Sequence, residues 1–335
     1  MNTFSFRRFA LLTIAAVLTA AVAMAQGVLR RPTTTVITHP TAVTTQSNKA
    51  NFKAGKKYTS TQKKTRKQKT SEPASQPQAP ATKQDLFAKY RIPTDAIDSQ
   101  ASGMTAEEMY QRGEDYFFGN GVPEDQSIAV MWYQKAANQK HVLAEHDLGY
   151  CFLTGSGVKQ DYDKAFHWFN ESAIAGNFDS QMTMGEIYFK GIGVDYNPTR
   201  AVEWYRKAAE QGYEAAQYQL ANCYAEGEGV QQDFYKANEW FLEAAMQGNV
   251  ESAYQLGRSY LTGEGVEKNY EEAAKWLEQA ASLDHQDAQF YFADLVMRGR
   301  GVEQDYDRSL ELLKDLARKG HERSQTKLTK MEETW

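Results

Sequence analysis

The sequence predicts an all-α superhelical solenoid of six 36-residue helix-turn-helix repeats with a C-terminal capping helix. Two series of residues recur at steps of 36 without insertion or deletion. The first is a large apolar position: Trp132, Trp168, Trp204, Trp240, Trp276 and Leu312. The second is a Gly-x-Gly-Val tetrad that begins at Gly119, Gly155, Gly191, Gly227, Gly263 and Gly299. Self-similarity at such a period is typical of arrays whose units bury their apolar faces only against neighbouring units.

The third unit illustrates how each repeat is expected to fold. Residues 181–189 contain no proline and stop before Gly191, where a positive φ favours glycine, so they predict a first helix. Asn197 is a good N-cap residue and opens a second helix. In that helix the spacing of the alanines and Trp204 places them on one apolar face, and Gly212 ends the helix. Each unit is therefore predicted to be helix A, a glycine turn, helix B and a second turn, with Trp204 in the core.

The two ends of the array depart from the repeat pattern, as terminal repeats should. Thr105 and Glu108 form a capping-box pattern at the start of the first unit. Arg112 then stands where later units carry a large apolar residue, and Leu312 replaces tryptophan in the sixth unit. Residues 324–331 predict a seventh helix A that closes the stack.

The motif that carries a family resemblance is met almost completely in the second unit. The matching residues are Ala144, Leu148, Gly149, Phe152, Gly155, Gly157, Val158, Asp161, Lys164, Ala165, Trp168, Ala173 and Gly176. In this pattern the chain resembles the Sel-1-like repeat family, a relative of the tetratricopeptide repeats, over about residues 106–331, and the array is assigned to residues 106–335. The resemblance implies an α/α superhelix that acts as a non-catalytic adaptor.

Residues 1–25 are predicted to be a secretory signal peptide. Two arginines precede an uncharged apolar run, and Ala23-Met24-Ala25 fits the small-x-small cleavage rule. No cysteine follows the run, so lipid attachment is not expected. The sequence leaves open whether the run is cleaved or kept as an anchor, because it falls just short of the roughly 20 residues of a spanning helix. An exported protein, periplasmic or at the surface of a bacterium, is the expectation.

Residues 26–84 are predicted to be a disordered basic leader, followed by a lead-in over residues 85–105. The leader holds 12 Lys and Arg residues and one acid, Glu72, whereas residues from 85 onward hold 24 bases and 42 acids. Few large apolar groups are present to offset the entropy of ordering the leader. It is expected to serve as a tether, or to bind a polyanionic envelope component such as anionic lipid or glycan. Nucleic acid is not expected as a partner of an exported chain.

We find no constellation typical of catalysis, so neither an enzyme nor a cofactor or metal site is expected. Ser60 and Ser324 each begin a Ser-x-x-Lys motif, but the partner motifs of serine β-lactam hydrolases are absent. The six histidines have no metal-ligand spacing. Cys151 and Cys223 lie two units apart, too far for a disulfide, and are expected to be buried.

The expected partner-binding residues come from two columns of helix A, read at 36-residue steps. The first column is Tyr110, His146, Met182, Tyr218, Tyr254 and Phe290. The second column is Glu114, Tyr150, Glu186, Asn222, Arg258 and Asp294. A third, apolar column (Phe117, Leu153, Phe189, Ala225, Leu261 and Met297) favours core packing between repeats. For the aromatic column, core and groove remain equally open. The polar column is the better groove marker, because core positions do not alternate among acid, amide and base.

The predicted function is therefore a protein- or peptide-binding scaffold in the bacterial cell envelope that uses the concave face of the solenoid. Aromatic residues beside a varied polar column suit an extended peptide or a partner helix. Two alternatives remain from other classes. One is an envelope anchor whose basic leader binds glycan or anionic lipid. The other is a cell-wall or β-lactam hydrolase that uses a Ser-x-x-Lys motif.

Overall fold

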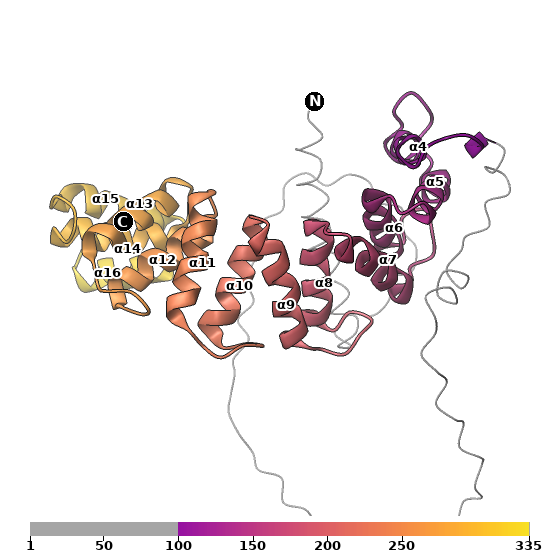
Figure 1. Ribbon diagram of the computed structural model, residues 1–335. Coiled ribbons are helices and arrows are strands. Elements are labelled where there is room, and N and C mark those ends of the chain that lie inside the picture. Colours follow the sequence, from indigo (N-terminus) through magenta and orange to yellow (C-terminus); the bar gives the residue numbers. More distant parts are fainter. Residues whose placement is uncertain (1–99, 335) are drawn as a thin grey trace, which may run out of the picture.

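The computed structural model describes residues 100–334, and these residues contain thirteen α-helices and no strand (Figure 1). The predicted signal peptide and basic leader, together with residues 85–99 of the lead-in, lie outside the described residues. The end of the lead-in contributes to the fold, because Ala101 is buried in the core beside the first repeat.

Helices A and B alternate through the six units, and every one of them is 13 residues long apart from the shorter final helix. The A helices are α4 (Ala106–Phe118), α6 (Val142–Thr154), α8 (Phe178–Lys190), α10 (Glu214–Glu226), α12 (Val250–Thr262) and α14 (Gln286–Arg298). The B helices are α5 (Gln126–Asn138), α7 (Tyr162–Ile174), α9 (Pro198–Glu210), α11 (Phe234–Met246), α13 (Tyr270–Ser282) and α15 (Tyr306–Arg318). The predicted closing helix is α16 (Glu322–Lys330).

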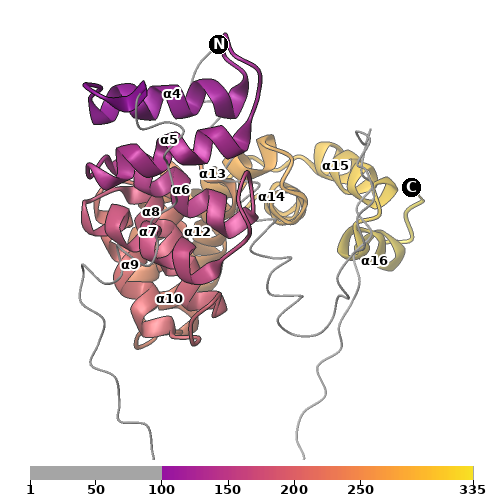
Figure 2. The same cartoon turned by 90° about the vertical axis from the view of Figure 1, so that its right-hand side faces the viewer.

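The helices form an elongated, curved stack in which each helix packs mainly on the helices before and after it in the chain. The array descends from α4 to α10 and rises again towards α15, and α4 and α16 lie at opposite ends (Figures 1 and 2). The predicted all-α solenoid with a C-terminal capping helix is confirmed.

Local capping explains why each element begins and ends where it does. All six predicted N-caps of helix B accept a backbone N–H from the first turn: Asp125, Asp161, Asn197, Asp233, Asn269 and Asp305. The first glycine of every tetrad ends helix A in the left-handed conformation. The capping box of Thr105 and Glu108 is also present, so these parts of the sequence interpretation are confirmed.

The core of each unit is built by the residue that follows the tryptophan column. Tyr133, Phe169, Tyr205, Phe241, Leu277 and Leu313 are all buried. In four units this side chain packs directly on a glycine of helix A. A Cβ added to Gly185 would lie 2.4 Å from the Tyr205 ring, and one added to Gly113 would lie 2.5 Å from Tyr133. The two helices of a unit therefore approach as closely as they do because helix A carries no side chain at that point.

The tryptophan column itself is buried unevenly along the array. Trp132, Trp168 and Trp276 are buried, whereas Trp204 and Trp240 are only half-buried. The Nζ atom of Lys207 lies 3.8 Å from the centroid of the Trp204 ring, on its partly open side. The prediction of a core position for Trp204 is therefore met only in part, because the neighbouring Tyr205 fills the space between the helices of its unit.

The second glycine of the tetrad sets the spacing between units. A Cβ added to Gly229 would lie 2.3 Å from the carbonyl oxygen of Pro198 at the start of the preceding helix B. One added to Gly157 would lie 2.2 Å from the carbonyl oxygen of Gln126. In the first unit, a Cβ added to Gly121 meets nothing within 4 Å, and no helix B precedes it among the described residues. The second glycine of the tetrad is thus required by the close approach of two units as well as by the positive φ of the turn.

Candidate partner-binding surface

The side of helix A that faces away from helix B forms a continuous strip along the array. We define the inner strip as the positions of Leu143, Asp147, Tyr150 and Thr154 and their equivalents at 36-residue steps in α4, α8, α10, α12 and α14. Steps of four, three and four residues keep these positions on one face of each helix. The four residues in α6 are all half-buried. This strip is where the structure leaves helix A open to a partner.

The polar column of helix A and the outward face of helix B differ in their exposure to solvent. The outward face of α9 carries Glu203, Arg206, Lys207 and Glu210, which are all exposed. The six residues of the polar column, such as Asn222, are instead half-buried. The outward face of helix B is therefore more open to solvent than the polar column of helix A.

The polar column of predicted site residues lies on the inner strip throughout. Glu114, Tyr150, Glu186, Asn222, Arg258 and Asp294 are all half-buried, one in each unit. Some of their polar groups are held by neighbours: Glu186 pairs with Lys190 at 2.9 Å, and Tyr133 donates to Glu114 at 2.5 Å. These six residues occupy equivalent positions of the six A helices, and each side chain is partly exposed to solvent.

The aromatic column lies deeper, at the junctions between successive A helices. Tyr110, Met182 and Tyr254 are buried, and His146, Tyr218 and Phe290 are half-buried. The Tyr254 ring stacks on His285 of the next unit with centroids 4.3 Å apart. Burial raises the pKa of Tyr254 to about 12, with the Asp287 carboxylate adding to the shift. We call these six residues of the aromatic column the floor of the inner strip, because they pack between successive A helices. The polar column is more exposed than they are.

Three histidines connect neighbouring units at this floor. His141, His285 and His321 are the N-caps of α6, α14 and α16. In His285 the Nδ1 atom accepts the backbone N–H of Ala288, and Nε2 lies 3.0 Å from Glu251 of the preceding helix A. The sequence reasoning missed these acids, although they recur at the Leu143 position of the inner strip as Glu107, Asp179, Glu251 and Asp287.

Charge is distributed unevenly along the inner strip. In α4, α6 and α8 the strip carries Glu107, Glu114, Asp147, Asp179 and Glu186 against a single base, Lys190. The corresponding positions of α16 carry Arg323, Lys327 and Lys330. Burial raises the pKa of Tyr133 well above its ordinary value, and Asp147 and Glu114 raise it further. The first half of the strip is therefore an electronegative surface and the C-terminal end an electropositive one.

Neither Ser324 nor the two cysteine thiols have the surroundings of a nucleophile. Ser324 is buried and its hydroxyl lies 2.8 Å from His321 Nδ1, while Lys327 pairs with Asp294. The two members of this Ser-x-x-Lys motif are thus engaged with different partners, and the copy at Ser60 lies outside the described residues. Cys151 and Cys223 are free and buried, and burial raises the pKa of Cys223 to about 12, so its thiol stays protonated at neutral pH.

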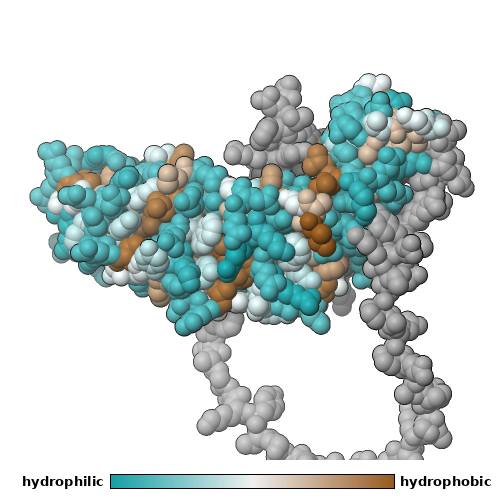
Figure 3. All heavy atoms as spheres, in the orientation of Figure 1, coloured by the Kyte–Doolittle hydropathy of each residue, from teal (hydrophilic) through white to brown (hydrophobic). Residues whose placement is uncertain are grey.

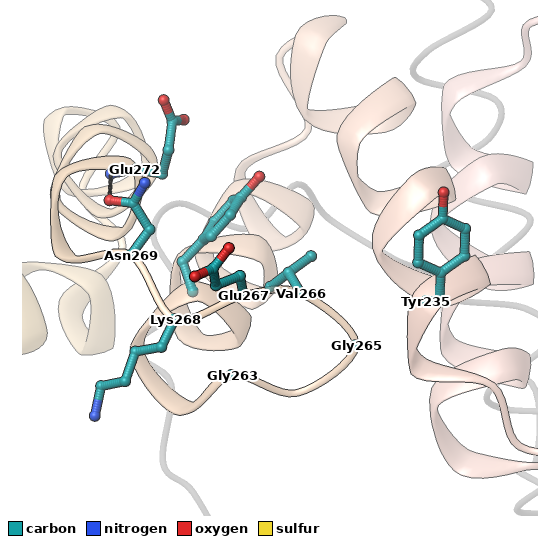
Figure 4. Close-up of a pocket in the computed structure, with 9 residues that line it drawn as sticks. Tyr235, Gly263, Gly265, Val266, Glu267, Lys268, Asn269 and Glu272 are labelled. Carbon is teal, nitrogen blue, oxygen red and sulfur yellow. Dashed lines mark hydrogen bonds between the residues drawn. The ribbon is translucent and has the colours of Figure 1, made fainter.

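Two hollows lie away from the inner strip. One lies beside the turn between α12 and α13, where Figure 4 shows Tyr235 on the neighbouring helix and Lys268 pointing away. Asn269 is used there to cap α13, accepting the N–H of Glu272 at 3.2 Å. The other lies between α9, α10 and α11 and includes Arg206, which donates to Tyr224 at 2.9 Å. Polar groups do not converge on a reacting centre in either hollow.

Hydrophobic side chains on the face seen in Figure 3 form narrow bands between broad hydrophilic areas. Within residues 100–334, no group of three or more His, Cys, Asp or Glu side chains is arranged to hold a metal ion. No helix of the described part is both long and apolar enough to cross a membrane.

Comparison with known proteins identifies the repeat. The Sel1 repeat model matches six consecutive segments of the chain, at residues 108–141, 142–177, 179–213, 214–249, 250–285 and 286–321. The chain belongs to the Sel1 repeat family. Sel1 repeat proteins are in general scaffolds for protein–protein interaction and are typically not catalytic.

Two solved structures of this family resemble the chain over 71% of its length. A protective antigen of uropathogenic Escherichia coli with an SLR fold is 36% identical, with a TM-score of 0.64 and 51% of its own chain covered. A Sel1 repeat protein from Oxalobacter formigenes is 30% identical, with a TM-score of 0.55 and 94% of its chain covered. The present chain therefore spans about half of the first protein. A search of curated proteins gives no significant match.

Proposed function

We propose that this Sel1 repeat protein is a non-catalytic scaffold that binds a protein or peptide partner along the inner strip, in the bacterial cell envelope. The observation that carries the proposal is the polar column from Glu114 to Asp294, which stays half-buried in all six units. Ordered polar side chains above an aromatic floor offer selectivity and contact area together. The envelope location rests on the predicted signal peptide, and a related structure is that of a protective antigen.

The middle of the inner strip is the best place to test partner binding. Asn222 and Arg258 occupy the polar column in consecutive units, and the Arg258 guanidinium lies 5.8 Å from the centroid of the Tyr254 ring. We expect a photo-crosslinking residue placed at 222 or 258 to capture the same discrete protein from a bacterial envelope fraction. The matched outer positions Glu203 and Glu239 are exposed on helix B and should not capture it. Equal capture from the outer positions would contradict binding along the inner strip.

Substitution gives a quantitative second measure. Asn222→Ala combined with Arg258→Ala should weaken capture by about tenfold, equivalent to ~1.4 kcal/mol of binding free energy. Because both side chains are only half-buried, the melting temperature should change little. The control variant, Glu203→Ala with Glu239→Ala, should bind as the original chain does. Loss of melting temperature in proportion to the loss of capture would instead assign these residues a structural role.

A second candidate function rests on the composition of the leader. Its 12 bases and one acid suit an anchor that binds anionic lipid or acidic glycan. If so, the full chain should sediment with phosphatidylglycerol vesicles and be released by salt, and removal of Lys63 to Lys69 should abolish sedimentation. Sedimentation that survives this deletion would argue against the anchor.

A further inference from the structure

We propose that the basic leader docks on the acidic first half of the inner strip of its own chain, and so covers the units α4–α8 until a partner or salt displaces it. Because this contact lies within one chain, it can form whether or not an external partner binds. It follows from three observations about charge, reach and the floor of the strip.

Charge complementarity is the first observation. The segment Lys63-Lys64-Thr65-Arg66-Lys67-Gln68-Lys69 holds five bases in seven residues. The strip of α4, α6 and α8 offers five carboxylates and one lysine, whereas the equivalent positions of α16 are basic. A basic segment is thus attracted to the beginning of the array and repelled from its end. The polarity of the strip selects one place for the leader.

Reach is the second observation. The leader is joined to the array directly at the acidic end, since 36 residues separate Lys69 from Ala106, the first residue of α4. A chain of that length with the statistics of a flexible linker spans about 35 Å, and adjacent helices pack roughly 8–10 Å apart. The basic segment therefore reaches the strip of the first three units. A tether of this kind raises its local concentration to the order of millimolar, which suits a set of individually weak ion pairs.

Pre-ordering of the acids is the third observation. Tyr110 donates to Asp147 at 2.9 Å, and Tyr133 donates to Glu114 at 2.5 Å. Each tyrosine uses an edge of its carboxylate and leaves the negative charge on the strip. Because these tyrosines are buried, the carboxylates are held in place and lose little conformational freedom when a cation arrives.

Trypsin cleavage of the leader in the full chain measures the docking directly, since the segment from Lys63 to Lys69 offers five basic cleavage sites. At low salt we expect cleavage between Lys63 and Lys69 to be about fivefold slower than in a separate peptide of the same sequence, as for a weak site at millimolar local concentration. Raising the salt to 1 M shortens the Debye length from about 10 Å to about 3 Å and should remove the difference. The separate peptide also corrects for the effect of salt on trypsin.

Two variants of equal charge change assign the surface. Asp147→Asn, Asp179→Asn and Glu186→Gln together remove three of the five negative charges of the inner strip in α4, α6 and α8. This variant should abolish the protection. Glu203→Gln, Glu210→Gln and Glu239→Gln neutralise three exposed acids of the B helices and should leave it intact. Circular dichroism checks that both variants are folded. If the inner variant does not fold, the salt dependence and the concentration dependence of the original chain still decide the question.

The proposal is overturned if the leader of the original chain is cleaved at low salt as fast as the separate peptide. Loss of protection in the outer variant to the same degree would also overturn it. Protection that increases with protein concentration would assign the leader to a second copy, and would contradict the intramolecular contact. Constant protection across a hundredfold range of concentration is the expected result.

Discussion

The tryptophan position of helix B and the residue that follows it are buried to different degrees, although both recur every 36 residues. The tryptophan position faces the boundary of the unit, and its burial varies from complete at Trp168 to half at Trp204. The residue after it is buried in every unit, because it lies over the glycine or alanine of helix A. Sequence periodicity shows that both positions are apolar, but it cannot tell which of two neighbours faces the paired helix. That distinction depends on how the two helices cross.

A comparison of two tryptophans tests this distinction. Trp168→Ala should lower the free energy of unfolding by about 3–5 kcal/mol, because it leaves a cavity in the core. Trp204→Ala should cost only about 1–2 kcal/mol, since the side chain is only partly buried and Lys207 lies over its ring. Urea unfolding of both variants measures the difference. Equal costs would show that the position in the repeat, and not local burial, decides the contribution.

At the level of the helices and turns, the sequence predicted caps and boundaries well, because these depend on residues next to one another in the chain. Asn197 and Gly191 are examples, since each satisfies or ends its own helix. Contacts between units were harder to predict. The burial of Tyr254 depends on His285, 31 residues later, which reaches back over the ring from the next unit. A helical wheel of one helix does not contain that information, so the aromatic column could not be divided between core and groove.

The second glycine of the turn allows a matched test of unit spacing. Gly121 and Gly229 have φ values of +74° and +76°, so alanine carries the same conformational cost at both. Only Gly229 has a preceding backbone within 4 Å of the added Cβ. Gly229→Ala should therefore lower the free energy of unfolding by about 1–3 kcal/mol more than Gly121→Ala does. Thermal unfolding of the two variants provides the comparison, and equal melting temperatures would exclude the close approach as a constraint.

The closing helix α16 is attached by a charged contact that depends on pH. Burial of Asp294 acts to raise its pKa, but Lys327 and Arg298 together hold that pKa below the ordinary value. Since the folded pKa lies below the unfolded one, the contact stabilises the fold above pH 4 or so and is lost as the pH falls through the folded value. Amide protection factors in α16 should therefore fall in acid. In Lys327→Met they should be lower at pH 7 and change less with pH; an unchanged acid response would implicate other groups.

Within residues 100–334 each unit packs mainly on the units before and after it, and the repeat pattern alone does not show how firmly each unit is held. Terminal units have one neighbour and inner units have two. In such an array, stability is approximately the sum of unit and interface contributions. Opening should therefore begin at the ends, which is a property of the assembly and not of any single repeat.

Hydrogen exchange followed by mass spectrometry tests this expectation. Peptides from α8 to α11 should be the best protected, and those from α4 and α16 should exchange first. The small apolar cluster beneath α16, which contains Ala293, Leu313, Ala317 and Leu328, is separate from the main core and supports this order. Uniform protection from α4 to α16 would mean that the array unfolds as one cooperative block.

The second glycine of units two to six lies against the start of helix B of the preceding unit, so the joints between these units are built alike. A segment of 36 residues cut at two successive turns keeps one second glycine and one helix B start, which are the two sides of a joint. Duplication or removal of a whole 36-residue segment would therefore preserve every remaining joint. A change of any other length would leave a second glycine without the helix B start on which it packs. The protein can thus be lengthened or shortened by gene duplication or deletion in steps of one repeat, which alters the length of its inner strip and leaves the remaining joints unchanged.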